Sequence, residues 1–274
     1  APGGLRIAAH DLVLIMDEAH RYRAKAGMTA IAELRPVIGL ELTATPRSVG
    51  ARSVPFKNVI YDYPLGQAMV DGYVKDPAVA TREGFRADSV TPEQLERMKL
   101  EDGIHCHEHT KAELAIYAQQ TGRKLVHPFM LVVAQDTAHA SEIRKHVESD
   151  EFFQGRYKGR VIEVHSGTRG EETEEATAKL VALEHDAQTD IVIHVNKLKE
   201  GWDVTNLYTI VPLRASASDI LTEQTLGRGL RLPYGQRTGV EAVDRLTIIA
   251  HDRFDDVIKA ARDPDSLISI RKTV

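Results

Sequence analysis

Two adjacent carboxylates follow directly on an apolar run near the amino end of the chain. Residues 12–16 read LVLIM, and Asp17, Glu18, Ala19 and His20 come next. Two carboxylates at the end of a buried strand need compensation, because burying an unpaired charge is expensive. A Mg²⁺ ion held by Asp17, directly or through water, with Glu18 directed at a water molecule, would give both groups a task. The alternative is that Asp17 or Glu18 only caps the helix that follows.

Hydroxyl side chains follow the next apolar run. Residues 37–42 read VIGLEL, and Thr43, Ala44 and Thr45 follow them before Pro46. If the two runs form neighbouring parallel strands, their carboxyl ends lie at one edge of the sheet, where ligands of α/β proteins bind. Thr43 and Thr45 would then lie beside the carboxylates. A simple turn would explain Thr45 and Pro46 taken alone.

These two patterns resemble the motifs of a known class of motor proteins. DEAH at 17–20 and TATP at 43–46 resemble motifs II and III of superfamily 2 helicases and translocases. The motor of that superfamily consists of two RecA-like domains that close over ATP. The resemblance therefore implies that the distal half of the chain carries the motifs of a second RecA-like domain.

The first distal pattern is NKLKEGWDV at 196–204, which resembles motif V of helicase-like proteins. Gly201 would let the backbone approach a phosphate closely, because glycine has no side chain. The resemblance implies that Asp203 binds a backbone or ribose group.

The second distal pattern is EQTLGRGLR at 223–231, which resembles motif VI. At about 100° per residue, Gln224, Gly227, Arg228 and Arg231 would occupy one helical face roughly 100° wide. Two arginines on that face could reach across a cleft to the γ-phosphate of ATP. An arginine in that position stabilises transition-state charge and can raise the rate by about 10³ to 10⁵. A solvated basic helix face is the alternative for the RGLR sequence by itself.

Longer stretches around these motifs resemble the Res subunit of type III restriction enzymes. The stretches are LVLIMDEAHRYRA, LELTATP, HPFMLVVAQDTAHA, LKEGWDVTNLYTIVPLRA and EQTLGRGLRLPYG. The resemblance implies an ATP-dependent translocase or helicase that moves on double-stranded DNA, with ATP and Mg²⁺ as cofactors. It also implies a DNA methyltransferase (modification) subunit as the partner that supplies sequence specificity.

The same resemblance assigns roles to the site residues. Asp17 would be the metal ligand, and Glu18 would position and deprotonate the attacking water. His20 would contact the nucleotide, and His20, Thr43 and Thr45 would couple the nucleotide state to the contact between domains. Lastly, Arg228 and Arg231 would complete the site from the second domain; Gly201, Asp203, Gln224 and Gly227 would contact the nucleotide.

The elements that must position these residues follow from seven short apolar runs. The runs are 12–16, 37–42, 129–134, 160–164, 190–195, 207–213 and 246–250. Near-continuous apolar runs are typical of parallel strands covered on both faces. Helix-start signals lie between them at Thr137 or Ser141, before an acid-rich segment at 171–184, and at Ser218 and Asp219.

We therefore predict an α/β fold with two RecA-like parallel-sheet domains, of which the first is present only as its carboxyl-terminal part. Residues 1–63 would form that part, and residues 64–274 would form the second domain. An insertion at about 83–125 would contain a helix near 111–122. The run at 129–134 would supply the first strand of the second domain.

Composition sets outer limits on function. The chain has 274 residues, a formal net charge of −5 and a single cysteine. A slightly acidic chain is not a basic wrapper for nucleic acid, so any such binding would come from a local groove. The single cysteine and the lack of a signal-like segment favour a cytoplasmic protein, and no apolar run is long enough to cross a membrane.

One expected motif is missing from the sequence. No G-x-x-x-x-G-K-[ST] phosphate loop occurs, so the phosphates of ATP lack their usual cradle. We therefore expect the missing amino-terminal part of the motor to lie upstream, and this chain to be a poor ATPase alone. Two alternatives follow: a catalytically incomplete scaffold that binds nucleic acid or protein, and an RNA helicase motor.

Three histidines, His105, His107 and His109, alternate along the sequence HCHEH. In an extended chain they would share one face and could bind Zn²⁺. Ligands with only this spacing form an uncommon site, so we do not predict a metal there.

Overall fold

The computed structural model describes residues 12–43, 54–63, 65–86, 89–165, 178, 182–195, 204–213, 229–251 and 272–273. The chain divides into two compact units, residues 1–62 (unit 1) and residues 63–274 (unit 2).

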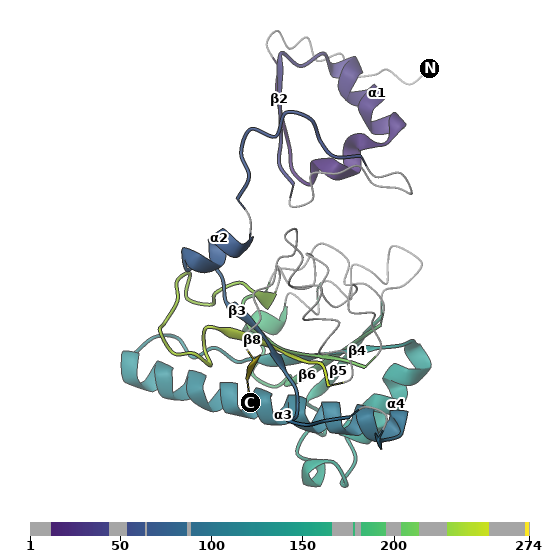
Figure 1. Cartoon of the computed structure of the whole chain (residues 1–274), viewed down its shortest axis with the longest axis vertical. Helices are drawn as coiled ribbons and strands as arrows, with labels where there is room; N and C mark the ends of the chain where they lie inside the picture. Colours follow the sequence, from purple (N-terminus) through teal and green to yellow (C-terminus); the bar gives the residue numbers. More distant parts are fainter. Residues whose placement is uncertain are drawn as a thin grey trace. The chain divides into compact units, whose positions relative to one another are not determined.

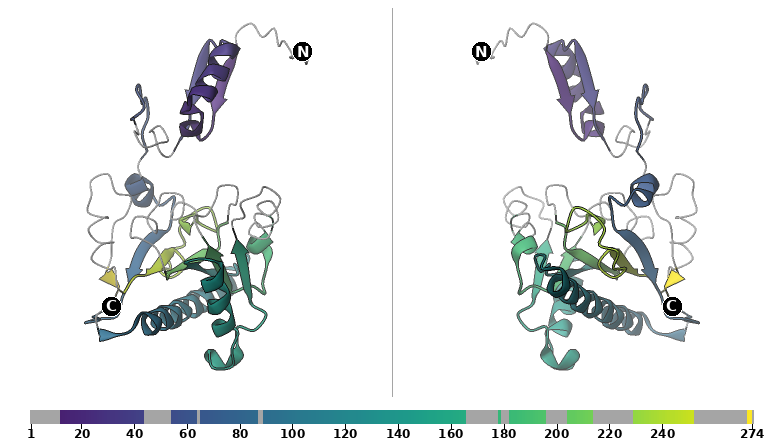
Figure 2. Two further views of the ribbon diagram at one scale, coloured as in Figure 1. Left: turned by 90° about the vertical axis from the view of Figure 1, so that its right-hand side faces the viewer. Right: turned by 90° about the vertical axis from the view of Figure 1, so that its left-hand side faces the viewer.

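Unit 1 contains a two-stranded parallel sheet. Strand β1 (Val13–Met16) pairs with β2 (Ile38–Glu41), with Val13 opposite Ile38 and Met16 opposite Glu41. The connection consists of the 3-10 helix η1 (Ala19–Arg23) and helix α1 (Lys25–Leu34). Figures 1 and 2 show α1 lying alongside the two strands. The β-α-β order brings the carboxyl ends of β1 and β2 to the same edge of the sheet.

Unit 2 contains a seven-stranded sheet in the order β5-β6-β4-β7-β8-β3-β9. Every recorded strand pair in it is parallel. The strands are β3 (Asp76–Ala80), β4 (Phe129–Ala134), β5 (Val161–His165), β6 (Ile191–Val195), β7 (Leu207–Pro212), β8 (Arg245–Ile249) and β9 (Lys272–Thr273).

The described helices of unit 2 are α2 (Leu65–Val70), α3 (Pro92–Thr121) and α4 (Thr137–Val147), with short 3-10 turns at Phe153–Gly155 and Leu183–His185. Figure 1 shows the long helix α3 running across one face of the sheet. None of these described helices combines the length and hydrophobicity of a membrane span.

Helix α3 begins and ends with clear local signals. The Thr91 hydroxyl accepts the Gln94 amide at 3.3 Å, and the Gln94 side chain accepts the Thr91 amide at 2.9 Å, which forms a capping box. Gly122 ends the helix in the left-handed region, with φ 69°. Within the helix, a side chain at Gly103 would come within 2.5 Å of a Val211 methyl group, so α3 lies very close to β7.

The core lies on both faces of the unit 2 sheet. Along β4, Met130 and Val132 pack with buried residues of α3 and α4, whereas Leu131 packs on the opposite face. All residues of β6 and β7 are buried. This burial explains why the two strand sequences are mostly apolar and do not alternate between apolar and polar residues.

The predicted α/β fold with parallel sheets is confirmed, and all seven predicted runs form strands whose ends differ by at most one residue from the prediction. Two expectations were wrong. Residues 129–134 do not supply the first strand of the second unit, because β3 precedes them in the chain. The helix expected near 111–122 begins at Pro92 and spans 30 residues.

Candidate functional site

The carboxyl ends of β1 and β2 are joined by main-chain hydrogen bonds. The Leu42 amide donates to the Met16 carbonyl at 2.8 Å, and the Ala19 amide donates to the Leu42 carbonyl at 3.0 Å. These bonds hold the turn that contains Asp17 and Glu18 against the residues that follow β2. The predicted neighbourhood of carboxylates and a threonine hydroxyl is therefore present for Thr43, whereas Thr45 lies outside the described residues.

Glu18 has an unusual backbone conformation. Its φ of 49° and ψ of 46° place it in the left-handed region, which non-glycine residues rarely adopt. Such a conformation costs about 1 kcal/mol or more, and it recurs at functional sites where the surrounding structure holds it in place. Here the Glu18 amide donates to Asp17 Oδ1 at 2.9 Å. Glu18 precedes η1, yet its side chain makes no capping hydrogen bond, so the cap alternative does not explain this residue.

His20 connects the two strand ends. Its side chain is buried, and its Nδ1 atom lies 2.9 Å from Thr43 Oγ1 and 3.2 Å from Glu18 Oε2. A proton on Nδ1 can be donated to either oxygen, while a neutral ring without that proton would accept from the Thr43 hydroxyl. The three side chains Glu18, His20 and Thr43 therefore form one connected group, which we call the strand-end triad.

An ion pair that the sequence patterns did not reveal fixes the turn from the other side. Arg23, the last residue of η1, pairs with Glu41 at the end of β2. Its guanidinium group also lies 4.1 Å from the centroid of the Phe56 ring, within the range of a cation–π contact. No fixed spacing predicts such a pair, because the partners come from different elements and meet only in the folded chain.

The chemistry of Asp17 fits a magnesium ligand. Its side chain is exposed, and only one of its two carboxylate oxygens is recorded as the acceptor of the Glu18 amide. In nucleotide sites Mg²⁺ is held by one or two carboxylates and completes its shell with water and phosphate oxygens. An exposed carboxylate at the end of β1 is compatible with that arrangement.

Most of the distal site residues lie outside the described residues: Gly201, Asp203, Gln224, Gly227 and Arg228. Arg231 is described, and it is not part of a helix. It forms an antiparallel bridge with Val74 and is exposed. The helical face expected for Gln224, Gly227, Arg228 and Arg231 therefore does not include Arg231.

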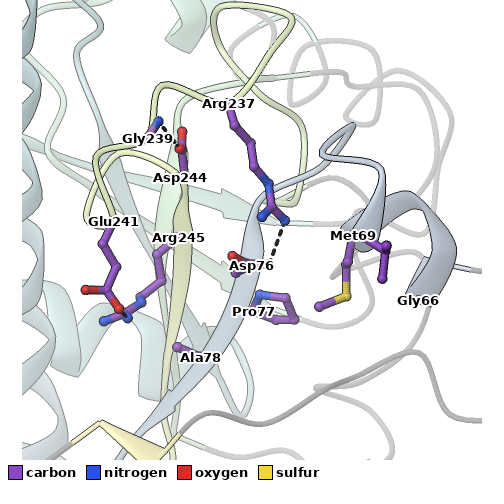
Figure 3. Close-up of a pocket in the computed structure, with 11 residues that line it drawn as sticks. Gly66, Met69, Asp76, Pro77, Ala78, Arg237, Gly239, Glu241, Asp244 and Arg245 are labelled. Atoms are coloured by element: carbon purple, nitrogen blue, oxygen red, sulfur yellow. Dashed lines mark hydrogen bonds and ion pairs between the residues drawn. The ribbon is translucent and has the colours of Figure 1, made fainter.

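A pocket in unit 2 is built from charges that already have partners. Figure 3 shows it between α2, β3 and the segment before β8, with a volume of about 660 Å³. Arg237 donates to Asp76 at 2.6 Å, and the Gly239 amide donates to Asp244 at 2.8 Å. Because its charges are satisfied within the protein, this pocket does not have the free polar groups that would fix a polar ligand.

The three alternating histidines lie in α3, where His107 is on a different face from His105 and His109. His107 is buried, whereas His105 and His109 are exposed. His107 Nε2 lies 3.4 Å from Asp190 Oδ1. The Glu108 carboxylate lies near both groups, so the three side chains resemble a metal-binding group.

Asp190 already has cationic partners, however. Lys111 Nζ donates to its Oδ1 at 2.7 Å, and Arg160 pairs with its Oδ2. Burial alone would raise the pKa of Asp190, but hydrogen bonds from His107, Arg160 and Lys111 lower that pKa well below its ordinary value. The group is therefore a charge cluster that ties α3 to the start of β6.

Comparison with known proteins locates a resemblance at the strand-end triad. Residues 5–48 match the family model of the type III restriction enzyme, res subunit, a match that covers less than a fifth of the 274 residues. The predicted Res-like character is thus confirmed for the segment that contains β1, η1, α1 and β2. No curated protein sequence matches the chain.

Solved structures similar to the chain include an ATP-dependent Type ISP restriction-modification enzyme, LlaBIII, bound to DNA, at 15% identity and a TM-score of 0.48. Dbp5 of S. cerevisiae bound to RNA and ADP BeF3 is similar at 13% identity and a TM-score of 0.46. The helicase domain of Pyrococcus furiosus Hef is similar at 12% identity and a TM-score of 0.39.

These matches cover 97%, 95% and 91% of this chain, respectively, and 22%, 59% and 73% of the other chains. This chain therefore spans about a fifth of the length of the restriction-modification enzyme and about three fifths of the length of Dbp5.

Proposed function

We propose that this chain is part of an ATP-driven motor of the restriction type, which couples ATP hydrolysis to movement on double-stranded DNA. The observation that carries the proposal is the strand-end triad, because it places a carboxylate, an imidazole and a hydroxyl at the carboxyl ends of two adjacent parallel strands. In open α/β sheets this edge is where ligands bind. The family-model match covers the same residues.

Each side chain of the site has a task in this proposal. Asp17 would be the ligand of the Mg²⁺ that accompanies ATP, and the ion would neutralise charge on the phosphates. Glu18 would orient a water molecule and accept its proton, a role that requires a carboxylate within hydrogen-bonding reach of that water. His20 would transmit the position of Glu18 to Thr43, and from there to the contact with the second domain.

The backbone strain at Glu18 supports this assignment. A strained residue persists only when its surroundings hold it, and strain at a site that needs a fixed carboxylate is a common form of pre-organisation. The Arg23–Glu41 pair and the main-chain bonds to Leu42 supply that hold. A residue that served only to cap η1 would not need this conformation.

We further propose that residues 1–63 are the carboxyl-terminal part of a first RecA-like domain and that residues 64–274 form the second. The open face of the unit 1 sheet supports a missing remainder. Val13 and Ile15 are 57% and 66% exposed, and their register partners Ile38 and Leu40 are 60% and 41% exposed on the same face. Parallel sheets are normally covered on both faces, so this face needs a further layer of the protein.

That missing layer would also supply the phosphate loop. The sequence has no glycine-rich loop with a lysine to hold the β and γ phosphates, and Arg228 with Arg231 would only complete the site from the other side. We therefore propose that this chain hydrolyses ATP slowly by itself. A protein that joins it to an upstream segment with that loop, the extended protein, would be the active motor, and a DNA methyltransferase subunit would direct it to its sites.

The first test replaces Glu18 with glutamine in the extended protein. We expect DNA-stimulated phosphate release to fall by about 10²- to 10⁴-fold, because the amide cannot accept the proton of the attacking water. Phosphate release with duplex DNA, with RNA and without nucleic acid is the measurement, and Glu33→Gln on exposed α1 is the control. Undiminished hydrolysis in the Glu18 variant would refute the assignment of the base.

The same assay separates the rival functions. Stimulation by RNA but not by duplex DNA would identify an RNA motor. Nucleic-acid binding without any hydrolysis by the extended protein would identify a scaffold.

A further inference from the structure

A lysine side chain lies fully inside unit 2, away from the strand-end triad. Lys75, directly before β3, has a relative exposure of 0%. Lysine is almost never fully buried without a partner, because removing its charge from water is expensive. The position therefore requires an explanation in terms of what the ammonium group holds.

The ammonium group of Lys75 is surrounded by main-chain carbonyl oxygens. Its Nζ atom donates to the carbonyls of Thr205 at 2.8 Å, Leu207 at 2.9 Å and Gly229 at 3.2 Å. An ammonium group has three N–H donors, so the three carbonyls match its full donor capacity, whereas a neutral amine has only two. The nitrogen also lies 3.8 Å from the centroid of the Tyr208 ring, where the electron-rich face favours a cation.

The charge of Lys75 is under opposing influences. Burial lowers the pKa of Lys75 well below its ordinary value, while the carboxylate of Asp244 raises it. The Asp244 carboxylate accepts hydrogen bonds from the amides of Thr238 and Gly239, the latter drawn in Figure 3. The three carbonyls and the aromatic ring also favour the ammonium form, because a neutral amine would direct its lone pair at one of these electron-rich groups.

The three carbonyls belong to the ends of two separate sequence motifs. Thr205 and Leu207 follow the motif V segment 196–204, and Thr205 is two residues beyond Asp203. Gly229 directly follows Arg228 of the motif VI segment. The Nζ atom of Lys75 thus connects two backbone segments, one close in sequence to Asp203 and the other close in sequence to Arg228.

Main-chain contacts of the same segment strengthen this connection. The Lys75 amide donates to the Leu230 carbonyl at 2.7 Å, and Val74 forms the bridge with Arg231. At the motif V end, the Asn206 amide side chain donates to the carbonyls of His127 and Leu183 at 2.8 Å and 2.9 Å. The start of β7 and the end of motif VI are therefore fixed to one another through the segment 74–75.

We propose that Lys75 is a positioning residue that holds the backbone of Thr205, Leu207 and Gly229 at a fixed spacing, on which the nucleotide contacts proposed for motifs V and VI depend. The inference rests on the proposed ATP-driven function. A hydrophobic residue of similar length would fill the space without the cost of a buried charge. The lysine adds three hydrogen bonds of defined geometry from one ammonium group. Such a constraint matters because a small misplacement of a catalytic group reduces the reaction rate strongly.

The test is a double-mutant cycle in the extended protein, with Lys75→Met and Arg228→Lys made singly and together. If Lys75 acts through Arg228, Lys75→Met lowers kcat for DNA-stimulated ATP hydrolysis by about 10- to 100-fold while KM for ATP changes little. In the Arg228→Lys background the same substitution then has a much smaller effect, because the arginine it positions is already absent. Lysine 99 supplies the matched control: Lys99→Met removes another buried ammonium group, which donates to the Pro212 carbonyl of β7 at 3.2 Å, away from the ends of motifs V and VI.

The outcomes separate this inference from the proposed function. An unchanged kcat in Lys75→Met, a loss equal to that of Lys99→Met, or losses that multiply independently in the double variant would overturn the role of Lys75 alone. No hydrolysis by the unmodified extended protein would overturn the proposed function and this inference with it. If Lys75→Met does not fold, Lys75→Gln, which keeps two N–H donors, replaces it, and failure of both to fold would show that Lys75 only maintains the structure.

Discussion

At the scale of single residues, the chemistry of the site depends on one strained backbone position. Glu18 adopts the left-handed conformation, and its side chain joins His20 and Thr43 in the strand-end triad. The types and order of these residues could be predicted from the sequence, because they follow two apolar runs. The conformation of Glu18 could not, since left-handed residues are usually indicated by glycine or asparagine and neither is present here.

The strain leads to a prediction that separates stability from function. Glu18→Gly should stabilise unit 1 by about 0.5 to 1 kcal/mol, because glycine adopts a positive φ without the steric cost. The same variant should lose ATP hydrolysis in the extended protein. Glu18→Gln, which keeps the side-chain bulk, should lose hydrolysis without the gain in stability.

Hydrogen exchange of the β1 and β2 amides during urea titration measures this effect, because it reports on unit 1 separately from unit 2. Faster exchange in Glu18→Gly than in Glu18→Gln would contradict the claim that the left-handed conformation stores strain.

At the scale of elements, seven of the described strands were predictable, whereas β3, β9 and the full length of the longest helix were not. Buried parallel strands have apolar sequences, so their positions were legible from residue types alone. Strand β3 (DPAVA) was missed because it is short and contains Pro77. Its place in the sheet depends on pairing with β8 and β9, which a local sequence pattern does not reveal. Helix α3 was underestimated because charged residues dominate its first half, although Thr91, Pro92 and Gln94 contained the signature of its start.

The attachment of α3 to the sheet can be tested at Asp190. Asp190→Asn should destabilise unit 2 by about 2 to 4 kcal/mol near neutral pH, because it leaves His107, Lys111 and Arg160 without their carboxylate. This loss of stability is smaller than that for breaking a fully buried ion pair, because Lys111 and Arg160 are each about a third exposed and water screens their charges.

The effect should depend on pH in one direction. Because the pKa of Asp190 is lowered in the folded protein, its charge stabilises the fold above the ordinary aspartate pKa of about 4, and the stabilisation is lost as pH falls below that value. Denaturant unfolding at about pH 7 and about pH 3 measures the difference between the two proteins. A difference that stays constant over this range, or one no larger than that of Asp150→Asn in an exposed pair with Lys158, would contradict the role of the charge.

At the scale of the whole molecule, the chain consists of two units that each contribute part of one proposed site. Unit 1 contains the strand-end triad, and unit 2 contains the backbone at the ends of motifs V and VI, which Lys75 holds. The sequence order of the motifs predicts that both units contribute to one nucleotide site, and this stays a prediction. How two such units meet around a nucleotide depends on tertiary contacts and on the bound ligand, and neither is encoded in a local pattern of residue types.

The proposed closure of the two units over ATP is tested most directly by measuring a distance between them. Spin labels at Lys25→Cys on α1 and Gln119→Cys on α3 occupy exposed positions, and Cys106→Ala removes the single native cysteine. In the extended protein with duplex DNA, we predict that a non-hydrolysable ATP analogue produces a new, shorter and narrower distance distribution, and that Arg228→Ala prevents it. An unchanged distribution in a protein that hydrolyses ATP would contradict the proposal that Glu18 and Arg228 act on one shared nucleotide.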